Sequence, residues 1–339
     1  MKYIACGQAS IDRITRPDGT VVGPYLGGPG VFGYTGMRLW DDDTTGILNI
    51  AADFFEYYGD WVEKNNVSTK AYNMVYDKTH VTNLIYRENG DYESVFKEEQ
   101  KWLNRIFEYA WTNVRIEQVE QFSKECKALY IFVEPMYKHF WKRLKEMSDQ
   151  YGFEVMWELG ILTNNGCDEQ FVLDCLDILK PEMASLNHNE SCYFFGTEDI
   201  DEIFERIYDL DIPYFFYRAG SKGSYSIFNR KSYFVPCIDI DGLPYADATG
   251  CGNTSTAAAT YAWANTKNPV MTAIMANIAA GYNVGYRGII DILSKERREE
   301  AQQLAIKYYD DYCKQNPRYV SEGYCASGNE ILFGKKQKQ

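Results

Sequence analysis

The sequence is poor in histidine and lacks a paired cysteine motif, and each absence disfavours a class of protein. Three histidines occur among 339 residues (80, 139 and 188), none paired with another at the spacing of metal ligands, which disfavours a zinc site or a histidine-dependent hydrolase. The nine cysteines are dispersed without a Cys-x-x-Cys pair, which is typical of reduced thiols in a cytosolic protein.

Long apolar runs and a basic balance are also missing. No stretch approaches 18 consecutive apolar residues, so we expect no membrane span. The apolar run in Met1–Gly7 is too short for a signal peptide. Lysine and arginine number 35 against 48 aspartates and glutamates, a net charge of −13 that repels nucleic acid and anionic lipid. We therefore expect a cytoplasmic protein without nucleic-acid or membrane partners, although an anionic small substrate remains compatible.

The order of apolar runs indicates an α/β fold. From about residue 113 the chain alternates short buried runs with 10–15-residue helical segments, a pattern typical of βαβ units and a mostly parallel sheet. The last third is predicted to be helical. Expected strands lie at about 2–6, 46–51, 128–133, 153–157, 183–186, 214–217 and 224–228. Expected helices lie at about 53–65, 113–125, 136–150, 169–179, 198–208, 251–265, 269–284 and 295–315.

Two hairpins precede this alternation. One surrounds Pro17-Asp18-Gly19, and the other turns at Asn89-Gly90, a strong hairpin signal. We expect their strands to pair into one small sheet that stands off the main body. The organisation is then a single domain over 1–330, with β segments at about 9–26 and 75–97 and a disordered tail over 331–339.

The segment from Asp247 to Ala258 is the most informative for function. Gly250 and Gly252 lead directly into an alanine-rich helix. Glycines allow a close approach of the backbone, and the first N–H groups of a helix form an anion site together with the helix dipole. The alternative is a glycine-containing helix start that packs against another element.

This segment resembles the signature of the ribokinase-like (PfkB) carbohydrate kinase family, in which Asp-x-x-Gly-Ala-Gly-Asp precedes a small-residue helix. The resemblance implies that the N–H groups of Gly250, Cys251 and Gly252 form an anion hole for the transferring phosphoryl group. It also implies that Asn253 occupies the position of the catalytic base.

Five further motifs follow the order of the same family, and the resemblance covers about residues 3–290. Asp12, Gly27, Gly28 and Phe32 would contact the acceptor. Asn187 and Glu190 match an Asn-x-x-Glu motif of the magnesium environment. The nucleotide would lie near Arg218, Gly220, Gly223, Asn277 and Ala280.

The resemblance implies a ribokinase-like three-layer α/β sandwich, with the two hairpins as a β lid. It implies ATP and Mg²⁺ as cofactors and leaves a monovalent cation open. It further implies a sugar or nucleoside as substrate and a homodimer through the lid.

Three positions depart from the family pattern. Asn253 replaces the usual aspartate, and an amide is no general base, a role worth about 10²–10⁴-fold in rate. Phe32 replaces a polar residue that contacts the sugar, and Arg218 replaces a threonine with a cation suited to phosphate. The departures leave a catalytically weak or inactive pseudokinase in a regulatory role as the alternative to a kinase.

Each candidate residue also has a structural interpretation. Asp12 is compatible with a turn or cap, and Asn187 with Glu190 and also Asn253 are compatible with helix caps. Cys251 is either a thiol of low pKa at a helix N-terminus or a filler of a small-residue position.

A rival motif points to an oxidoreductase. Gly28, Gly30 and Gly33 match the dinucleotide fingerprint Gly-x-Gly-x-x-Gly, and Asp53 follows at about the required distance. The fingerprint needs a continuous strand before it, whereas Gly23-Pro24 interrupts this segment. No Gly-x-x-x-x-Gly-Lys-Ser/Thr loop exists, which excludes a P-loop NTPase. The prediction is therefore ATP-dependent phosphoryl transfer to a hydroxyl of a sugar, nucleoside or related polyol, ahead of a NAD-dependent oxidoreductase.

Overall fold

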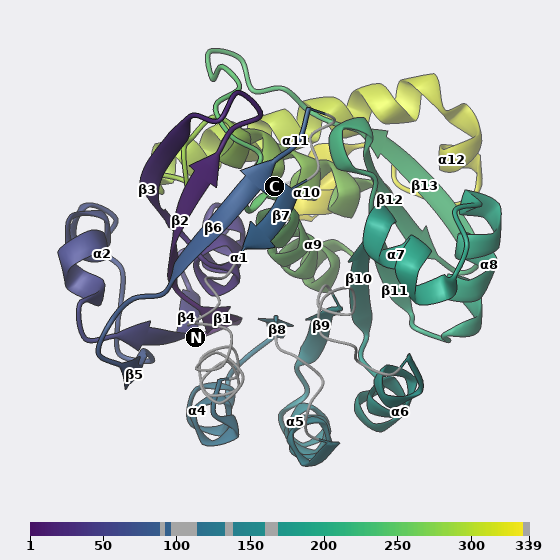
Figure 1. The fold of residues 1–339 in the computed structure, drawn as a ribbon. Coiled ribbons are helices and arrows are strands. Elements are labelled where there is room, and N and C mark those ends of the chain that lie inside the picture. Colours follow the sequence, from purple (N-terminus) through teal and green to yellow (C-terminus); the bar gives the residue numbers. More distant parts are fainter. Residues whose placement is uncertain (89–91, 96–113, 133–137, 160–168, 335–339) are drawn as a thin grey trace, which may run out of the picture.

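A computed structural model describes residues 1–88, 92–95, 114–132, 138–159 and 169–334 (Figure 1). The strands of the main sheet are β1 (Tyr3–Gln8), β4 (Thr44–Ala51), β5 (Asn73–Tyr76), β8 (Ala128–Ile131), β9 (Glu154–Glu158), β10 (Met183–Asn187), β11 (Tyr214–Arg218), β12 (Gly223–Phe228) and β13 (Lys231–Pro236). Their order is β13-β12-β11-β10-β9-β8-β1-β4-β5. All neighbours from β11 to β5 pair in parallel, which confirms the predicted α/β class.

Helices cover both faces of this sheet. Larger helices are α1 (Pro29–Arg38), α2 (Phe54–Lys64), α5 (Lys138–Tyr151), α6 (Glu169–Leu179), α7 (His188–Phe195), α8 (Ile200–Asp209), α9 (Cys251–Thr266), α10 (Pro269–Val284) and α11 (Lys295–Gln315). Shorter ones are α4 (Ile116–Phe122), α12 (Pro317–Ser321), α13 (Gly328–Phe333) and a 3₁₀ turn at Gly220–Lys222. Within the described residues, no helix combines the length and the hydropathy that a bilayer crossing requires.

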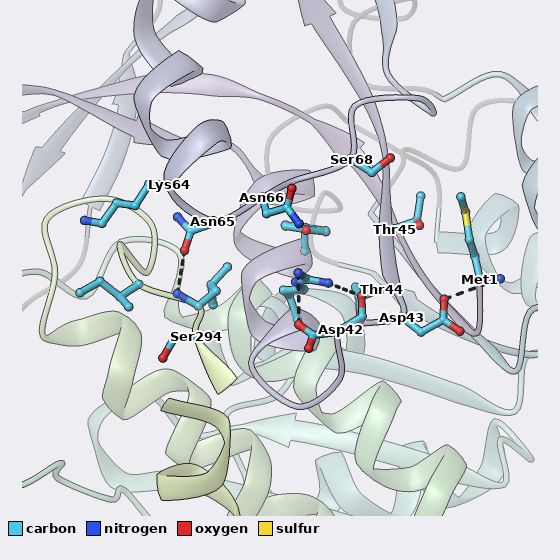
Figure 2. Close-up of a pocket in the computed structure, with 14 residues that line it drawn as sticks. Met1, Asp42, Asp43, Thr44, Thr45, Lys64, Asn65, Asn66, Ser68 and Ser294 are labelled. Atoms are coloured by element: carbon cyan, nitrogen blue, oxygen red, sulfur yellow. Dashed lines mark hydrogen bonds and ion pairs between the residues drawn. The ribbon is translucent and has the colours of Figure 1, made fainter. Parts of the chain in front are cut away.

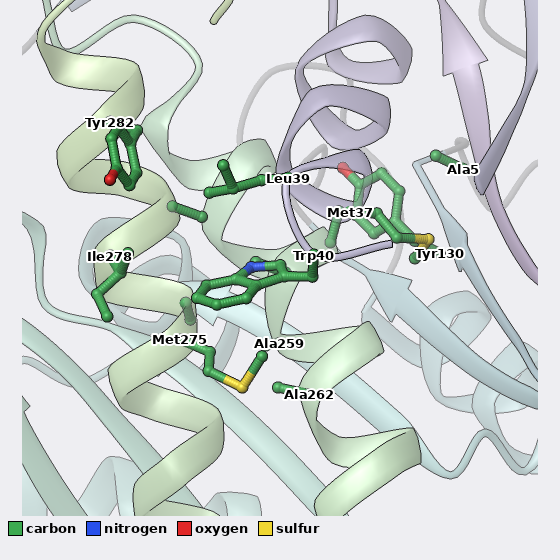
Figure 3. Close-up of a cluster of buried hydrophobic side chains, with 14 of the residues drawn as sticks. Ala5, Met37, Leu39, Trp40, Tyr130, Ala259, Ala262, Met275, Ile278 and Tyr282 are labelled. Atoms are coloured by element: carbon green, nitrogen blue, oxygen red, sulfur yellow. The ribbon is translucent and has the colours of Figure 1, made fainter. Parts of the chain in front are cut away.

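Successive side chains of a strand point to opposite faces, and this alternation creates two cores. Ile4 and Cys6 of β1 pack in the core beneath α4, α5, α6 and α8, whereas Tyr3 and Ala5 face the core of α1, α9 and α10. In Figure 3, Trp40 lies between residues of α9 and α10 in the second core. The three layers of helix, sheet and helix match the predicted sandwich.

A second sheet is built from the two early segments. Its strands are β2 (Ser10–Thr15), β3 (Val21–Gly27), β6 (Val81–Tyr86) and β7 (Tyr92–Val95), in the order β3-β2-β6-β7. Strand β2 pairs in parallel with β6, so the hairpins join as the sequence predicts. We call these four strands the small sheet.

Several elements were not predicted. Strands β5 and β13 lie at the two edges of the main sheet, where few residues need to be apolar. Helix α7 starts at once after β10; its start signal, Asn187-x-x-Glu190, was given as compatible with a helix cap, but no helix was predicted there. The tail expected from residue 331 is wrong at its beginning, because α13 continues to Phe333 with Ser327 as its N-cap. Residues 335–339 lie outside the described part.

Candidate active site

Four polar side chains form a row across the carboxyl ends of β8 to β11. On each strand this side chain points to the same face as the apolar residues that pack toward α9, and it lies closer to the carboxyl end of the strand. The four residues are Tyr130, Glu158, Ser185 and Arg218. All four are buried; Glu158 is 1% exposed and Arg218 is 8% exposed. Buried charge is costly unless it is paired, so their mutual contacts determine whether this arrangement is stable.

Arg218 neutralises two carboxylates. Its Nη1 lies 2.9 Å from Oε1 of Glu158, and its Nη2 lies 3.0 Å from Oε2 of Glu190. The Nε–H donates to Oγ of Ser185 at 3.1 Å. One cation between two carboxylates makes this group acidic overall, and the guanidinium that was expected to meet phosphate is already engaged.

The start of α9 lies against this group. Gly250 has a φ of +77°, and a Cβ there would lie 2.2 Å from the ring of Phe32. A Cβ on Gly252 would lie 2.4 Å from Nη1 of Arg218. Glycine is therefore required at position 250 by backbone conformation and by a close contact, whereas at position 252 the close contact with the Arg218 guanidinium is the reason for it. Residues 251–253 are half-exposed, whereas 254–260 are buried, so this end of the helix reaches the surface.

The backbone N–H groups at the start of α9 were expected to form an anion hole. The N–H of Cys251 donates to the carbonyl of Ala248 at 3.2 Å, so this member of the expected trio is engaged in a turn. The N–H groups of Gly252 and Asn253 have no intrahelical acceptor because they belong to the first turn. Burial raises the pKa of Cys251 to about 12, the opposite of the shift that a reactive thiol needs, which favours the small-residue interpretation.

Asn253 is the third residue of α9, so it is not the N-cap; Gly250 is. Its Nδ2 donates to Oε1 of Glu158 at 3.1 Å and to the hydroxyl of Tyr130 at 3.3 Å. The amide at the expected base position is thus tied to the carboxylate of the polar row.

Asn187 and Glu190 cap α7. Asn187 Oδ1 accepts from the Glu190 N–H at 2.8 Å, and Glu190 Oε2 accepts from the Asn187 N–H at 2.7 Å. Burial raises the pKa of Glu190, while Arg218 and the Asn187 N–H oppose the shift. The cap interpretation is confirmed by these bonds, and the ion pair joins the motif to the polar row.

Asp12 belongs to strand β2 of the small sheet. Its carboxylate is 4% exposed, and a Cβ on Gly27 would lie 2.0 Å from Oδ2. Burial raises its pKa to about 7, with a smaller contribution from Asp247; the Ser10 hydroxyl, 3.4 Å away, opposes the shift. Gly28, at a φ of +98°, packs against the backbone of Gln8 and Ser10.

The small sheet contacts the loop before α9. The hydroxyl of Thr249 donates to Asp247 at 2.8 Å, so the hydroxyl of Tyr86 is the donor in its 2.7 Å bond with Thr249. This bond joins β6 to the glycine loop.

Removal of this bond is expected to loosen the small sheet. In Tyr86→Phe the amides of β6 should exchange with solvent about 5- to 10-fold faster, because one hydrogen bond contributes roughly 1 kcal/mol. Hydrogen-exchange mass spectrometry measures this, with Tyr245→Phe, 74% exposed, as the control. Unchanged exchange in β6 would show that the bond contributes nothing to closure.

Two of the expected ligand contacts are corrected by the structure. Asn277 donates to the carbonyls of Val235 and Pro236 and accepts from Ser224, so its amide joins α10 to β12 and β13 and does not face a nucleotide. Phe32 is 2% exposed and packs on Gly250, which gives it no surface for a substrate.

Of the remaining residues expected near the nucleotide, Gly223 is buried, whereas Gly220 and Ala280 are not. A Cβ on Gly223 would lie 2.2 Å from the Val235 carbonyl. Gly220 is exposed with open space around it, and the Ala280 carbonyl lies 3.6 Å from the Cys251 thiol. Ala280 is therefore beside the start of α9.

The dinucleotide fingerprint lacks its structural context. Strand β3 does lead into α1, contrary to expectation, but it pairs antiparallel with β2 in the small sheet instead of entering a βαβ unit of the main sheet. Asp53 is buried and accepts hydrogen bonds from the N–H and hydroxyl of Thr79, both at 2.6 Å.

No cluster of three metal-ligating side chains occurs within the described ranges. A surface pocket of about 690 Å³ lies near the amino end of β4, lined by Asp42, Thr44, Asn65 and Ser294 among others (Figure 2). Since the polar row lies at the carboxyl ends of the strands, this pocket is not part of the candidate site.

Solved structures with the same architecture include sugar and nucleoside kinases. Nucleoside kinase from Burkholderia thailandensis, in complex with inosine, has a TM-score of 0.67 at 13% identity, over 91% of this chain and 98% of that one. The chain has the ribokinase-like fold. Fructokinase from Vibrio cholerae O395, with fructose, ADP and calcium bound, gives 0.62 at 13% identity over 88% and 98%. Adenosine kinase from Sinorhizobium meliloti gives 0.65 at 16% identity over 89% and 98%.

Sequence comparison adds no relative to this ribokinase-like chain: no family model and no curated protein matches it.

Sequence reasoning missed three residues of the polar row, Tyr130, Glu158 and Ser185. The available signal was the carboxylate of Glu158 directly after the apolar run 155–157, because a charged residue at the end of a buried strand needs a partner.

Proposed function

We propose that this protein transfers a phosphoryl group from ATP to a hydroxyl of a sugar, nucleoside or related polyol. The half-exposed first turn of α9, bordered by the acidic group of Glu158, Arg218 and Glu190, is the observation that carries the proposal. Supporting it, the solved structures of the same fold include kinases with inosine, or with fructose and ADP, bound.

In this mechanism the chain contributes positioning and electrostatic stabilisation. Asp12 accepts a hydrogen bond from an acceptor hydroxyl. The N–H groups of Gly252 and Asn253 stabilise charge that develops on the phosphoryl oxygens. The amide oxygen of Asn253 orients the attacking hydroxyl.

The nucleotide would approach along Gly220 and Ala280. Magnesium fits this site as a companion of the nucleotide, because Mg²⁺ is commonly held by substrate phosphates and one or two carboxylates. Glu190, together with Asn187, is the residue that would help to hold the ion. When bound, the ion would offset the phosphate charge.

A non-catalytic protein that binds a sugar or nucleotide is the second candidate, and Asn253 is the observation that favours it. Phosphoryl transfer through a loose transition state depends mainly on positioning and electrostatic stabilisation and less on a strong general base. For this reason we rank the kinase above the non-catalytic protein. A homodimer through the small sheet and a cytoplasmic location belong to the same proposal.

ADP release from Mg-ATP across a panel of sugars and nucleosides tests the proposal. We expect release with at least one acceptor, and calorimetric binding of Mg-ATP at millimolar concentration or below. Binding without release on every acceptor would favour the second candidate. Absence of Mg-ATP binding would overturn the kinase proposal, and a preference for NADH would overturn both candidates.

A further inference from the structure

Glu158 is a buried carboxylate that the mechanism above does not use. Its Oε1 accepts hydrogen bonds from Nη1 of Arg218 at 2.9 Å and from Nδ2 of Asn253 at 3.1 Å. Its Oε2 accepts from the hydroxyl of Tyr130 at 2.6 Å. Three donors from three different elements therefore converge on one side chain at the start of α9.

This arrangement fixes the orientation of the Asn253 amide. A carboxylate has only acceptors, so Asn253 must turn its NH₂ group toward Glu158. The two ends of an amide differ only in nitrogen and oxygen, and their assignment follows from the hydrogen-bond partners. The amide oxygen then points away from Glu158 and is the end that can accept from another group.

We propose that Glu158 is a positioning residue of the phosphoryl-transfer site: it holds the Asn253 amide oxygen toward the acceptor hydroxyl, and its own negative charge requires a neutral side chain at position 253. The positioning role rests on the proposed function. The requirement for a neutral side chain at position 253 depends only on the contact between Glu158 and Asn253. The negative charge of the site thus lies on β9 and not on α9.

The inference predicts an unusual response to a carboxylate at position 253. A helix dipole favours a negative charge in the first turn, so the dipole alone would make Asn253→Asp stabilising. Beside Glu158, however, the new carboxylate would lie at hydrogen-bond distance from another carboxylate, and the one cation there, Arg218, already pairs with Glu158 and Glu190. Like charges at this distance raise the pKa of the pair, and one carboxyl must stay protonated or remain strongly repelled.

The pH dependence of this penalty has a defined sign. A pKa raised in the folded state means that the folded protein binds a proton that the unfolded chain has released. Stability then falls as the pH rises from the unfolded pKa, near 4, toward the raised value. The destabilisation of Asn253→Asp should therefore be large at pH 8 and small at pH 5.

The experiment compares wild type, Asn253→Asp, Glu158→Gln and the double exchange Glu158→Gln/Asn253→Asp. By thermal unfolding at pH 8 and pH 5, we expect Asn253→Asp to melt several degrees below wild type at pH 8 only, and the double exchange to recover most of that loss. The matched control is Asn265→Asp near the other end of α9, where Lys127 lies 2.7 Å from Asn265 Oδ1. It should show no comparable pH-dependent loss.

Turnover gives the second readout, with ADP release as the assay. Glu158→Gln should lower kcat by about 10²-fold with little change in the KM for ATP, because it leaves the amide unoriented. Asn253→Asp alone should not exceed wild type, and the double exchange should exceed both single variants at least tenfold.

Either of two results would overturn the proposal: Asn253→Asp more stable than wild type at pH 8, or a double exchange no better than the single variants in both stability and turnover. If no variant releases ADP or binds Mg-ATP, the proposed function fails, while the melting comparison still decides whether Glu158 excludes a carboxylate. If wild type turns over and Glu158→Gln retains full kcat, the positioning role is wrong and the kinase proposal stands.

Discussion

Arg218→Met is expected to lower the free energy of unfolding by about 3–5 kcal/mol, because removing one partner leaves the charge of the other buried and uncompensated. Here two carboxylates, Glu158 and Glu190, lose the same cation. Burial already raises the pKa of Glu190 against the opposing effect of Arg218. Without Arg218 that pKa should rise further, so the loss should be larger at pH 8 than at pH 5. Urea unfolding at both values measures it.

Arg230→Met is the matched control for this result. Arg230 also meets two carboxylates, Glu205 at 3.3 Å and Asp209 at 3.5 Å, but all three side chains are at least 60% exposed. Exposed ion pairs contribute about 0–1 kcal/mol. Equal losses for the two variants would mean that burial does not strengthen the Arg218 contacts, and would contradict the description of the polar row.

Asp12→Asn should separate stability from binding. In the folded protein burial raises the pKa of Asp12 to about 7, well above its unfolded value. The folded state therefore holds a proton between about pH 4 and pH 7 that the unfolded chain releases, and stability falls as pH rises through this window, by about 4 kcal/mol in total. Asparagine removes this dependence, so the variant should be more stable than wild type at pH 8.

The same variant should lose affinity for the acceptor. In this variant an amide replaces the carboxylate that would accept a hydrogen bond from a hydroxyl of the acceptor. We therefore expect kcat/KM for the acceptor to fall about 10²-fold. Unfolding and ADP-release measurements at pH 8 check the two halves together. Asp60→Asn, on the exposed side of α2, is the control and should change neither. A destabilised Asp12→Asn protein at pH 8 would show that the buried carboxylate is ionised and well paired.

The layers of the fold could be predicted because they depend on local periodicity. A buried run between helical segments is visible in the sequence, and Ala128–Ile131 and Met183–Asn187 are examples. Edge strands such as Lys231–Pro236 expose alternate residues and carry a weaker signal.

The candidate site was predictable where glycine restricts the backbone or where a motif names the position. Gly250 is an example of the first, since its φ and its contact with Phe32 suit glycine, and Asn253 and Glu190 are examples of the second. By contrast, nothing in the sequence indicates that the amide of Asn277 is fully used by Val235, Pro236 and Ser224, since those partners are distant in the chain. Phe32 was misassigned because its position in a motif does not reveal the direction of its ring, which packs against the distant Gly250.

The polar row has one member on each of four neighbouring strands, which limits how this site can be engineered. No contiguous peptide carries it, so it cannot be grafted onto another scaffold as a loop or a helix. A one-residue deletion within β9 ahead of Glu158 would shift the register of the strand's end and turn that carboxylate toward the opposite core, where Trp141 packs. Length variation among engineered or recombined versions of this chain should therefore be tolerated between these strands and rejected within them.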